Sequence, residues 1–250
     1  MRAAKGIPST AAITPIQFCE KYCQYVDEGY TDVIHVPINR SGSSTYNNAV
    51  MAQGMLREER PEHHLNIHLL DPHTYSMVFG WYLCEMARKL QNGAELRHVI
   101  SEFESQMNKM EVILGPYSLK QMKKSGRISA AAAVMGELMG IRPIITLIDG
   151  KTRVESKVRG DDKVIPAMID LCKKRTEGVE DFDYMIGHTS IPQTAELEKV
   201  CRKAFGKAPL TTFNLGGVVS ANTGPDTLAL IYVGKARDLS ISRKDCCCAA

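Results

Sequence analysis

The loop of residues 39–45 holds the residues of this sequence best suited to bind an anion. It reads Asn-Arg-Ser-Gly-Ser-Ser-Thr, so one arginine stands among small and hydroxylated residues. Hydroxyl and backbone N–H groups donate hydrogen bonds, and each bond to a charged acceptor contributes roughly 1.5–3 kcal/mol. The composition of the loop therefore predicts a site for an anionic group.

Two regular elements must position this loop. Residues 33–38 form a short β-branched apolar run, the composition of a strand buried on both faces. Residues 46–56 have the spacing of a helix with apolar side chains along one side. A strand that passes through a loop into a helix leaves unpaired N–H groups and the positive end of the helix dipole at the loop, which favours anions. The simpler alternative is that Ser43, Ser44 or Thr45 only caps the helix.

The order of the expected elements predicts an α/β protein of two domains, residues 1–115 and residues 116–250. The first part alternates helices with short apolar strands, which indicates crossover units and a parallel sheet. In the second part, Asp149-Gly150 separates two strand-like runs and predicts a hairpin, so this sheet is mixed. The helices are expected at 15–28, 46–59, 74–90, 94–107, 118–124, 129–139, 164–174 and 195–205. The strands are expected at 33–38, 65–70, 112–114, 143–148, 152–158, 184–187, 210–214 and 227–233, with a polar loop at 220–225.

The composition of the 250 residues is that of an ordinary globular protein, with 44% hydrophobic and 24% charged residues. The net charge of +3 is small and dispersed, which argues against a nucleic-acid partner. No stretch approaches the roughly 18 apolar residues of a membrane span, and the N-terminus lacks the apolar core of a signal peptide. We therefore expect a cytoplasmic protein without stable membrane insertion.

The cysteines and histidines do not predict a metal site. Cys19 and Cys23 lie four residues apart on one expected helix, but no second close pair completes a zinc site. The four histidines between His63 and His73 fall in a strand and in separate loops. The residues Cys246 to Cys248 are expected to be a frayed tail.

Seven stretches, taken in order, resemble the DegV family of bacterial fatty-acid-binding proteins across essentially the whole chain. The motif Ser43-Ser44-Thr45-Tyr46 is similar to a family Ser-Gly-Thr-Tyr, and residues 10–18 (TAAITPIQF) are similar to a family Thr-Ser-x-Pro-Ser-Pro…Phe. The other matching stretches are residues 70–77, 119–129, 141–144, 157–160 and 222–225.

The resemblance implies a two-domain α/β carrier that holds one long-chain fatty acid between its domains. Ser43 matches the family's carboxylate-binding serine, with Ser44 beside it, and Thr10 matches the threonine that assists it. Asn222 lies where the family usually has a histidine near the head group. The ligand is then the fatty acid, with no cofactor and no catalytic residues in this chain.

The resemblance also implies a partner protein. Many members of the family present the acyl carboxylate to a separate fatty acid kinase, which forms an acyl phosphate for phospholipid synthesis. Arg127 and Arg159 match family arginines at the pocket mouth that are implicated in kinase docking or phosphate handling. The apolar stretches 74–86 and 130–139 are candidate tunnel lining, although plain core packing is the alternative for each residue in them.

The chain departs from the family pattern at several positions. Family chains begin with a strand and an Asp-Ser loop well before the position of Thr10, and this sequence shows neither. We therefore expect an apolar strand with an open edge in the first domain. Ala11 replaces a usual serine and Ser125 a usual glycine. Asn222 replaces the histidine, and an amide carries no titratable proton.

The same residues are compatible with two other functions. A small-molecule phosphotransferase subunit could use the loop of residues 40–45 for phosphate, but no Gly-x-x-x-x-Gly-Lys motif is present. A hydrolase could use Ser43 as its nucleophile, but the loop lacks Gly-x-Ser-x-Gly and no partner histidine is placed by the sequence.

Overall fold

The first helix begins at a capping box. The computed structural model describes residues 8–126 and 140–236 of the chain. The Thr14 hydroxyl accepts the N–H of Gln17 at 3.3 Å, the Gln17 side chain accepts the N–H of Thr14 at 3.0 Å, and Pro15 occupies the first helical position. These contacts account for the start of this helix, α1 (Pro15–Asp27), at the expected residue.

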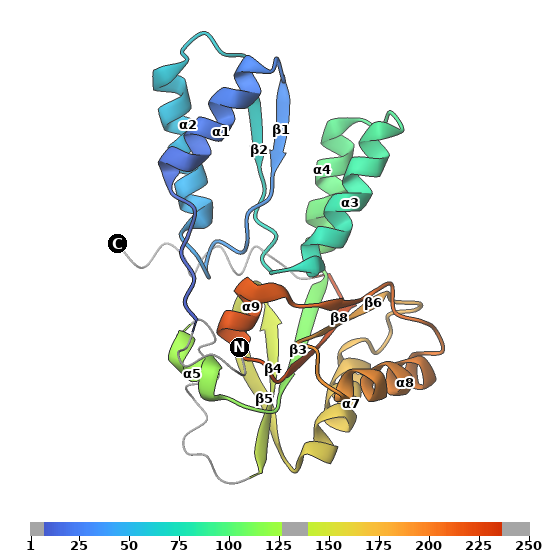
Figure 1. The fold of residues 1–250 in the computed structure, drawn as a ribbon. Helices are drawn as coiled ribbons and strands as arrows, with labels where there is room; N and C mark the ends of the chain where they lie inside the picture. The colour runs from blue at the N-terminus through green and yellow to red at the C-terminus, as the bar shows by residue number, and fades with distance from the viewer. Residues whose placement is uncertain (1–7, 127–139, 237–250) are drawn as a thin grey trace, which may run out of the picture.

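The small unit consists of two helices on a two-stranded parallel sheet (Figure 1). Its elements are α1 (Pro15–Asp27), β1 (Asp32–His35), α2 (Thr45–Glu59) and β2 (Asn66–Leu69). A core of buried side chains joins these elements: Phe18, Cys19, Tyr22, Ala49, Ala52, Leu56 and Leu65. Within the described residues, β1 and β2 pair only with each other, so each has an edge without a neighbouring strand.

The large sheet has six strands in the order β5-β4-β3-β8-β6-β7. All neighbours are antiparallel except β6 and β7, which are parallel. Its strands are β3 (Met110–Pro116), β4 (Ile141–Ile148), β5 (Lys151–Arg159), β6 (Tyr184–His188), β7 (Thr212–Asn214) and β8 (Thr227–Val233). The remaining elements are α3 (Met77–Gln91), α4 (Leu96–Met107), α5 (Lys120–Ser125), η1 (Asp161–Lys163), α7 (Val164–Arg175), α8 (Gln193–Phe205) and α9 (Gly216–Thr223).

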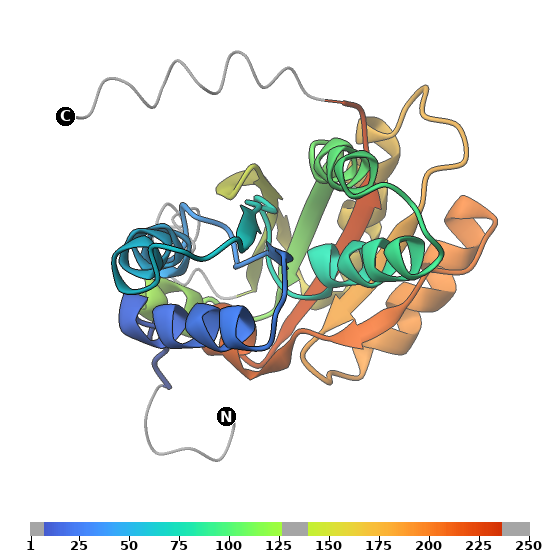
Figure 2. The same ribbon diagram turned by 90° about the horizontal axis from the view of Figure 1, so that it is seen from above.

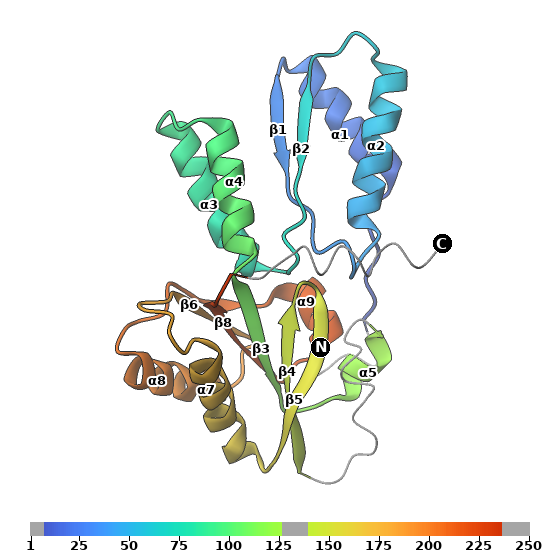
Figure 3. The same ribbon diagram turned by 180° about the vertical axis from the view of Figure 1, so that it is seen from behind.

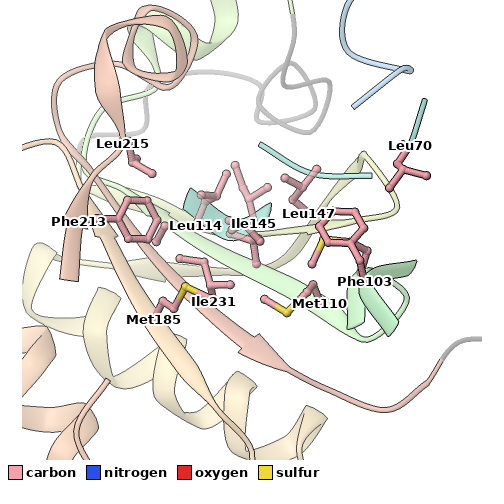
Figure 4. Packing of buried hydrophobic residues seen from close by; sticks show 14 of the residues in the cluster. Leu70, Phe103, Met110, Leu114, Ile145, Leu147, Met185, Phe213, Leu215 and Ile231 are labelled. Atoms are coloured by element: carbon pink, nitrogen blue, oxygen red, sulfur yellow. The ribbon is translucent and has the colours of Figure 1, made fainter. Parts of the chain in front are cut away.

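Alternate residues of the central strands bury the two faces of the large sheet, as strand geometry requires. On β8, Leu228, Leu230 and Tyr232 pack with side chains of α7 and α8. Figure 3 shows these two helices on one face of the sheet. Ala229 and Ile231 face the other side, which α3 and α4 cover. Figure 4 shows the labelled side chains of this second cluster.

Seen from above, the small unit and the α3–α4 pair lie side by side over the large sheet (Figure 2). The α/β class, the parallel first sheet, the mixed second sheet and the Asp149-Gly150 hairpin are confirmed. Asp149 and Gly150 have φ values of 48° and 72°, the left-handed conformation that a two-residue hairpin turn needs. None of the helices in the described segments combines the length and the apolar character needed to cross a membrane.

Three expectations about the elements are wrong. The strand expected at 112–114 does form, but it pairs antiparallel with β4 and β8 and so belongs to the large sheet. The strand at 33–38 is only half-buried: Val33 packs on the core of the small unit, Ile34 and Val36 pack on the cluster between the large sheet and α3–α4, and each side chain keeps part of its surface in solvent. Residues 216–223 form α9, so most of the polar loop expected at 220–225 is helical. The expected helix at 129–139 lies outside the described residues, and the division at residue 115 stays a prediction.

Candidate functional site

A cavity of about 590 Å³ lies between the small unit and the large sheet. The small unit contributes residues 10–13 and 42–45, and residues 74–76 follow strand β2. The large sheet contributes apolar side chains of its central strands, and α9 contributes residues 216–219. Cavities of about 300–1,000 Å³ hold small molecules and cofactors, so this one can hold a ligand of that size.

The lining of the cavity is apolar with hydroxyl groups, and among the described residues that line it none is charged and none is a histidine. Its apolar wall includes Val78, Phe79, Leu114, Leu147 and Ile231. In Figure 4, Leu114, Ile145 and Ile231 lie at the centre of the cluster, with Leu215 at the start of α9. An anionic head group would therefore meet neutral donors, and an apolar tail would meet an apolar wall.

The Ser43 hydroxyl is held by the start of α2. It lies 2.8 Å from the Thr45 hydroxyl, and it accepts the N–H of Thr45 at 3.2 Å. Ser44 occupies the cap position of α2, but its side chain makes no capping bond. The capping alternative therefore holds only for Ser43, which satisfies the first N–H of the helix and no later one.

The four residues expected to bind the ligand all line this one cavity. Thr10 and Ser44 are exposed at it, whereas Ser43 and Asn222 are half-buried. Asn222 lies on α9, and its amide donates to the carbonyl of Val218 at 2.9 Å. That bond uses one of its donors, so Asn222 is oriented by its own helix.

The fold and the sequence both match known proteins. The family model described as "Uncharacterised protein, DegV family" matches residues 1–235. The chain belongs to the DegV family. A DegV domain-containing protein of Clostridium perfringens is 29% identical over 232 residues, which cover 91% of this chain and 78% of the relative. A DegV domain-containing protein of Staphylococcus aureus is 28% identical over 240 residues, which cover 94% of this chain and 80% of the relative.

Solved structures of DegV proteins share this fold. The fatty acid binding DegV family protein of Streptococcus agalactiae superposes with a TM-score of 0.79 at 27% identity, over 94% of this chain and 81% of that chain. A stearic acid-binding protein from Eubacterium ventriosum has a TM-score of 0.82 at 20% identity, over 94% and 81% of the two chains. At 20% identity, the similarity to the Eubacterium ventriosum protein shows a shared fold only.

In this DegV protein, Asn39 ties the hydroxyl loop to its surroundings, a role that the sequence did not indicate. Its side chain is buried, donates to the Tyr75 hydroxyl at 3.0 Å and accepts from both the N–H and the hydroxyl of Ser41. Its backbone N–H donates to the carbonyl of Thr74 at 3.0 Å. A Cβ added at Gly150 would lie 2.1 Å from the Asn39 amide nitrogen, so the hairpin turn also touches this side chain.

The segment after β2 places two further polar side chains at the cavity. Thr74 is buried, and its hydroxyl has no hydrogen-bond partner among the described residues. Ser76 has a φ of 60° and a ψ of −150°, a conformation that is strained for any residue but glycine. Its hydroxyl donates to the carbonyl of Leu215 at 3.3 Å and so links the start of α3 to the start of α9. The only signal in the sequence was the family-like stretch 70–77.

Arg159 and Arg40 lie outside the cavity. Arg159 is exposed at the end of β5, and Arg127 lies outside the described residues. Arg40 stacks over the ring of Tyr46 at 5.5 Å and faces Asp71 at 4.0 Å. Burial raises the pKa of the Tyr46 hydroxyl, and the negative charge of Asp71 raises it further. Arg40 therefore packs on the outer side of the hydroxyl loop.

Proposed function

We propose that this DegV protein binds one long-chain fatty acid in the cavity, with the carboxylate at Ser43 and the tail along the apolar wall. The observation that carries the proposal is a cavity whose described lining residues carry no charge, and in which the hydroxyl loop meets apolar side chains of the large sheet. Related DegV structures carry heptadecanoic acid and vaccenic acid, which supports this ligand class.

The hydrogen bonds of Ser43 suit a donor to a carboxylate. An alcohol oxygen accepts two hydrogen bonds and donates one. When the Thr45 hydroxyl and N–H both donate to the Ser43 oxygen, the Ser43 proton remains for the ligand. Thr10 and Ser44 are then the further polar groups near the head, and Asn222 replaces a titratable group by an amide.

The tail supplies most of the affinity in this proposal. Burial of a methylene group contributes about 0.8 kcal/mol, so about 16 carbons offer roughly 12 kcal/mol before entropic costs. One charge-assisted hydrogen bond from Ser43 adds roughly 1.5–3 kcal/mol. The apolar wall therefore determines how tightly the ligand is held, and the hydroxyl loop determines its direction.

In this proposal the protein is a carrier, not an enzyme, and a fatty acid kinase forms the acyl phosphate while the acid is bound. The exposed side chain of Arg159 supports this role, because it is available to a partner without lining the cavity. Arg127 is proposed for the same surface. A cytoplasmic location stays a prediction from the sequence.

The other two functions have less support. A phosphotransferase that uses residues 40–45 would need Arg40 at the ligand, but Arg40 packs on Tyr46 and Asp71. A hydrolase would need a base beside Ser43, and no histidine is found among the described lining residues.

Extraction of the purified protein followed by mass spectrometry tests the proposal. We expect about one fatty acid per chain, whereas a phosphorylated metabolite would favour the phosphotransferase. The Val219→Phe variant fills part of the cavity and should bind a fluorescent acyl probe more weakly than the wild type. Val50→Phe is the matched control, because it adds the same volume at an exposed site outside the cavity. Absence of both bound fatty acid and probe binding would overturn the proposal.

A further inference from the structure

A second cluster of chemically reactive side chains lies in the small unit, away from the cavity. It consists of Cys19 and Cys23 of α1 and Glu59, the last residue of α2. Their two sulfur atoms and one carboxylate oxygen all lie within 4.8 Å of one another. In the described part of the chain, no other group of three cysteine, histidine or acidic side chains meets this condition. None of the three residues lines the cavity.

The packing of two helices creates this cluster. Residues four apart lie on one side of a helix, so Cys19 and Cys23 present neighbouring thiols on α1. The helices α1 and α2 lie side by side over the small sheet (Figure 1), and this brings Glu59 to the two thiols. The sequence suggested no site here because Glu59 stands 36 residues after Cys23.

We propose that Cys19, Cys23 and Glu59 bind one thiophilic divalent cation of the zinc type. Tetrahedral zinc with a sulfur ligand at about 2.3 Å and a carboxylate oxygen at about 2.1 Å separates these two atoms by roughly 3.6 Å. The Cys23 sulfur and the Glu59 Oε2 lie 3.6 Å apart. In the structure this contact is a hydrogen bond from the Cys23 thiol to Glu59, and a bound cation would replace its proton at nearly the same spacing of the two atoms.

The surroundings fit a cation with one open coordination position. Cys19 is buried, Cys23 is half-buried and Glu59 is exposed. The cluster is therefore open to solvent on the Glu59 side, where a water molecule can be the fourth ligand. The nearest positive side chain along the chain, Arg60, pairs with Asp27 at 3.7 Å. Calcium and magnesium prefer oxygen ligands only, so two thiolates favour zinc over them. Binding releases the two thiol protons to solvent.

The site would join α1 and α2, the two helices that follow the cavity-lining segments 10–13 and 42–45. At their starts, the Asn48 amide of α2 donates to the carbonyl of Ile13 at 2.7 Å, directly before α1. A cation on Cys19, Cys23 and Glu59 would add a second link between the same helices, farther along each. We expect the bound cation to stabilise the small unit, because it binds the folded arrangement of its ligands.

Cobalt and zinc titrations test the proposal on the full chain. The background protein carries Cys84→Ser, Cys246→Ser, Cys247→Ser and Cys248→Ser, which removes the exposed thiol of α3 and those of the tail, and it is kept reduced with a phosphine. We expect one Co²⁺ per chain with thiolate-to-cobalt absorption, displacement of Co²⁺ by Zn²⁺, and a higher melting temperature with Zn²⁺.

Variants of the ligands decide the assignment. Cys23→Ser should lower the thiolate-to-cobalt absorption at least twofold, because only the Cys19 thiolate remains, and Glu59→Gln should weaken Zn²⁺ binding at least tenfold. Glu58→Gln is the matched control, because it removes a neighbouring exposed carboxylate outside the cluster. If Cys23→Ser does not fold, Glu59→Gln decides alone. No thiolate-to-cobalt absorption in the background protein, or equal Zn²⁺ affinity of the Glu59→Gln and Glu58→Gln variants, would overturn the proposal. Binding of the acyl probe should not change in Glu59→Gln, so this result is independent of the fatty-acid proposal.

Discussion

The hydroxyl groups of Ser43 and Thr45 lie 2.8 Å apart at the start of α2. The N–H of Thr45 also points to the Ser43 oxygen, at 3.2 Å. Two donors from one residue can therefore fill both acceptor positions of Ser43 and direct its proton away from the helix. This pair connects the start of α2 to the proposed head-group contact.

Replacement of Ser43 by alanine should weaken fatty-acid binding without unfolding the chain. The loss should be about one charge-assisted hydrogen bond, roughly 1.5–3 kcal/mol, measured by displacement of a fluorescent acyl probe. Ser101→Ala serves as the control, because Ser101 is an exposed serine of α4 that does not line the cavity. Unchanged affinity in Ser43→Ala would argue against a carboxylate at this hydroxyl.

Asn39→Ala should lower both the free energy of unfolding and the affinity for the acyl probe. The variant removes the bond to Tyr75 and the two bonds from Ser41, and it leaves a buried gap beside Gly150. We expect a loss of stability of about 1–3 kcal/mol in urea unfolding, because buried donors and acceptors lose their partner. Asn47→Ala, an exposed asparagine of α2, should change neither quantity. Equal effects of the two variants would contradict the role given to Asn39.

The stability of the small unit should fall as the pH drops below the ordinary histidine range. The His35 ring packs on Phe18 with centroids 4.8 Å apart, its Nδ1 lies 2.6 Å from the Tyr22 hydroxyl, and burial lowers its pKa. Below a pH of about 6.5, His35 of the unfolded chain is therefore protonated, whereas buried His35 of the folded chain becomes protonated only at lower pH. The free energy of unfolding should then fall with decreasing pH, by up to about 1.4 kcal/mol per pH unit for this one group.

Urea unfolding between about pH 7.5 and pH 5.5, on either side of the ordinary histidine pKa, measures this dependence. His35→Gln should flatten the profile relative to the wild type, whereas His64→Gln, which replaces an exposed histidine, should not. Burial also lowers the pKa of His188, which stays in both variants and contributes in the same direction. The same slope in His35→Gln as in the wild type would show that His35 is not the group responsible.

Arg159→Ala should leave fatty-acid loading intact but slow the formation of acyl phosphate by a kinase partner. The reason is that Arg159 is exposed and does not line the cavity. The double variant with Arg127→Ala should be slower still. Arg153→Ala, another exposed arginine on β5, should be phosphorylated at the rate of the wild type. A parallel fall of loading and phosphorylation would instead place Arg159 at the ligand.

Local sequence signals were sufficient for most elements of the fold. The capping box at Thr14 and the Asp149-Gly150 turn act over a few residues, so the start of α1 and the β4–β5 hairpin could be predicted from the sequence. The alternation of side chains along β8 likewise follows from strand geometry. The stretch 216–223 was not predicted as a helix because two glycines and few strong helix formers hide its periodicity.

Partners far apart in the chain needed the tertiary structure. An apolar run such as 112–114 suits a parallel or an antiparallel neighbour, so only its pairing with β4 and β8 decided its sheet. The bond of Asn39 to Tyr75 joins the loops after β1 and β2, and the approach of Glu59 to Cys23 depends on how α1 packs on α2. The sequence by itself determined the family, the residue types of the hydroxyl loop and most helices and strands. The tertiary structure decided which of these residues share a cavity or a cluster, because contacts between distant residues depend on packing that local periodicity does not encode.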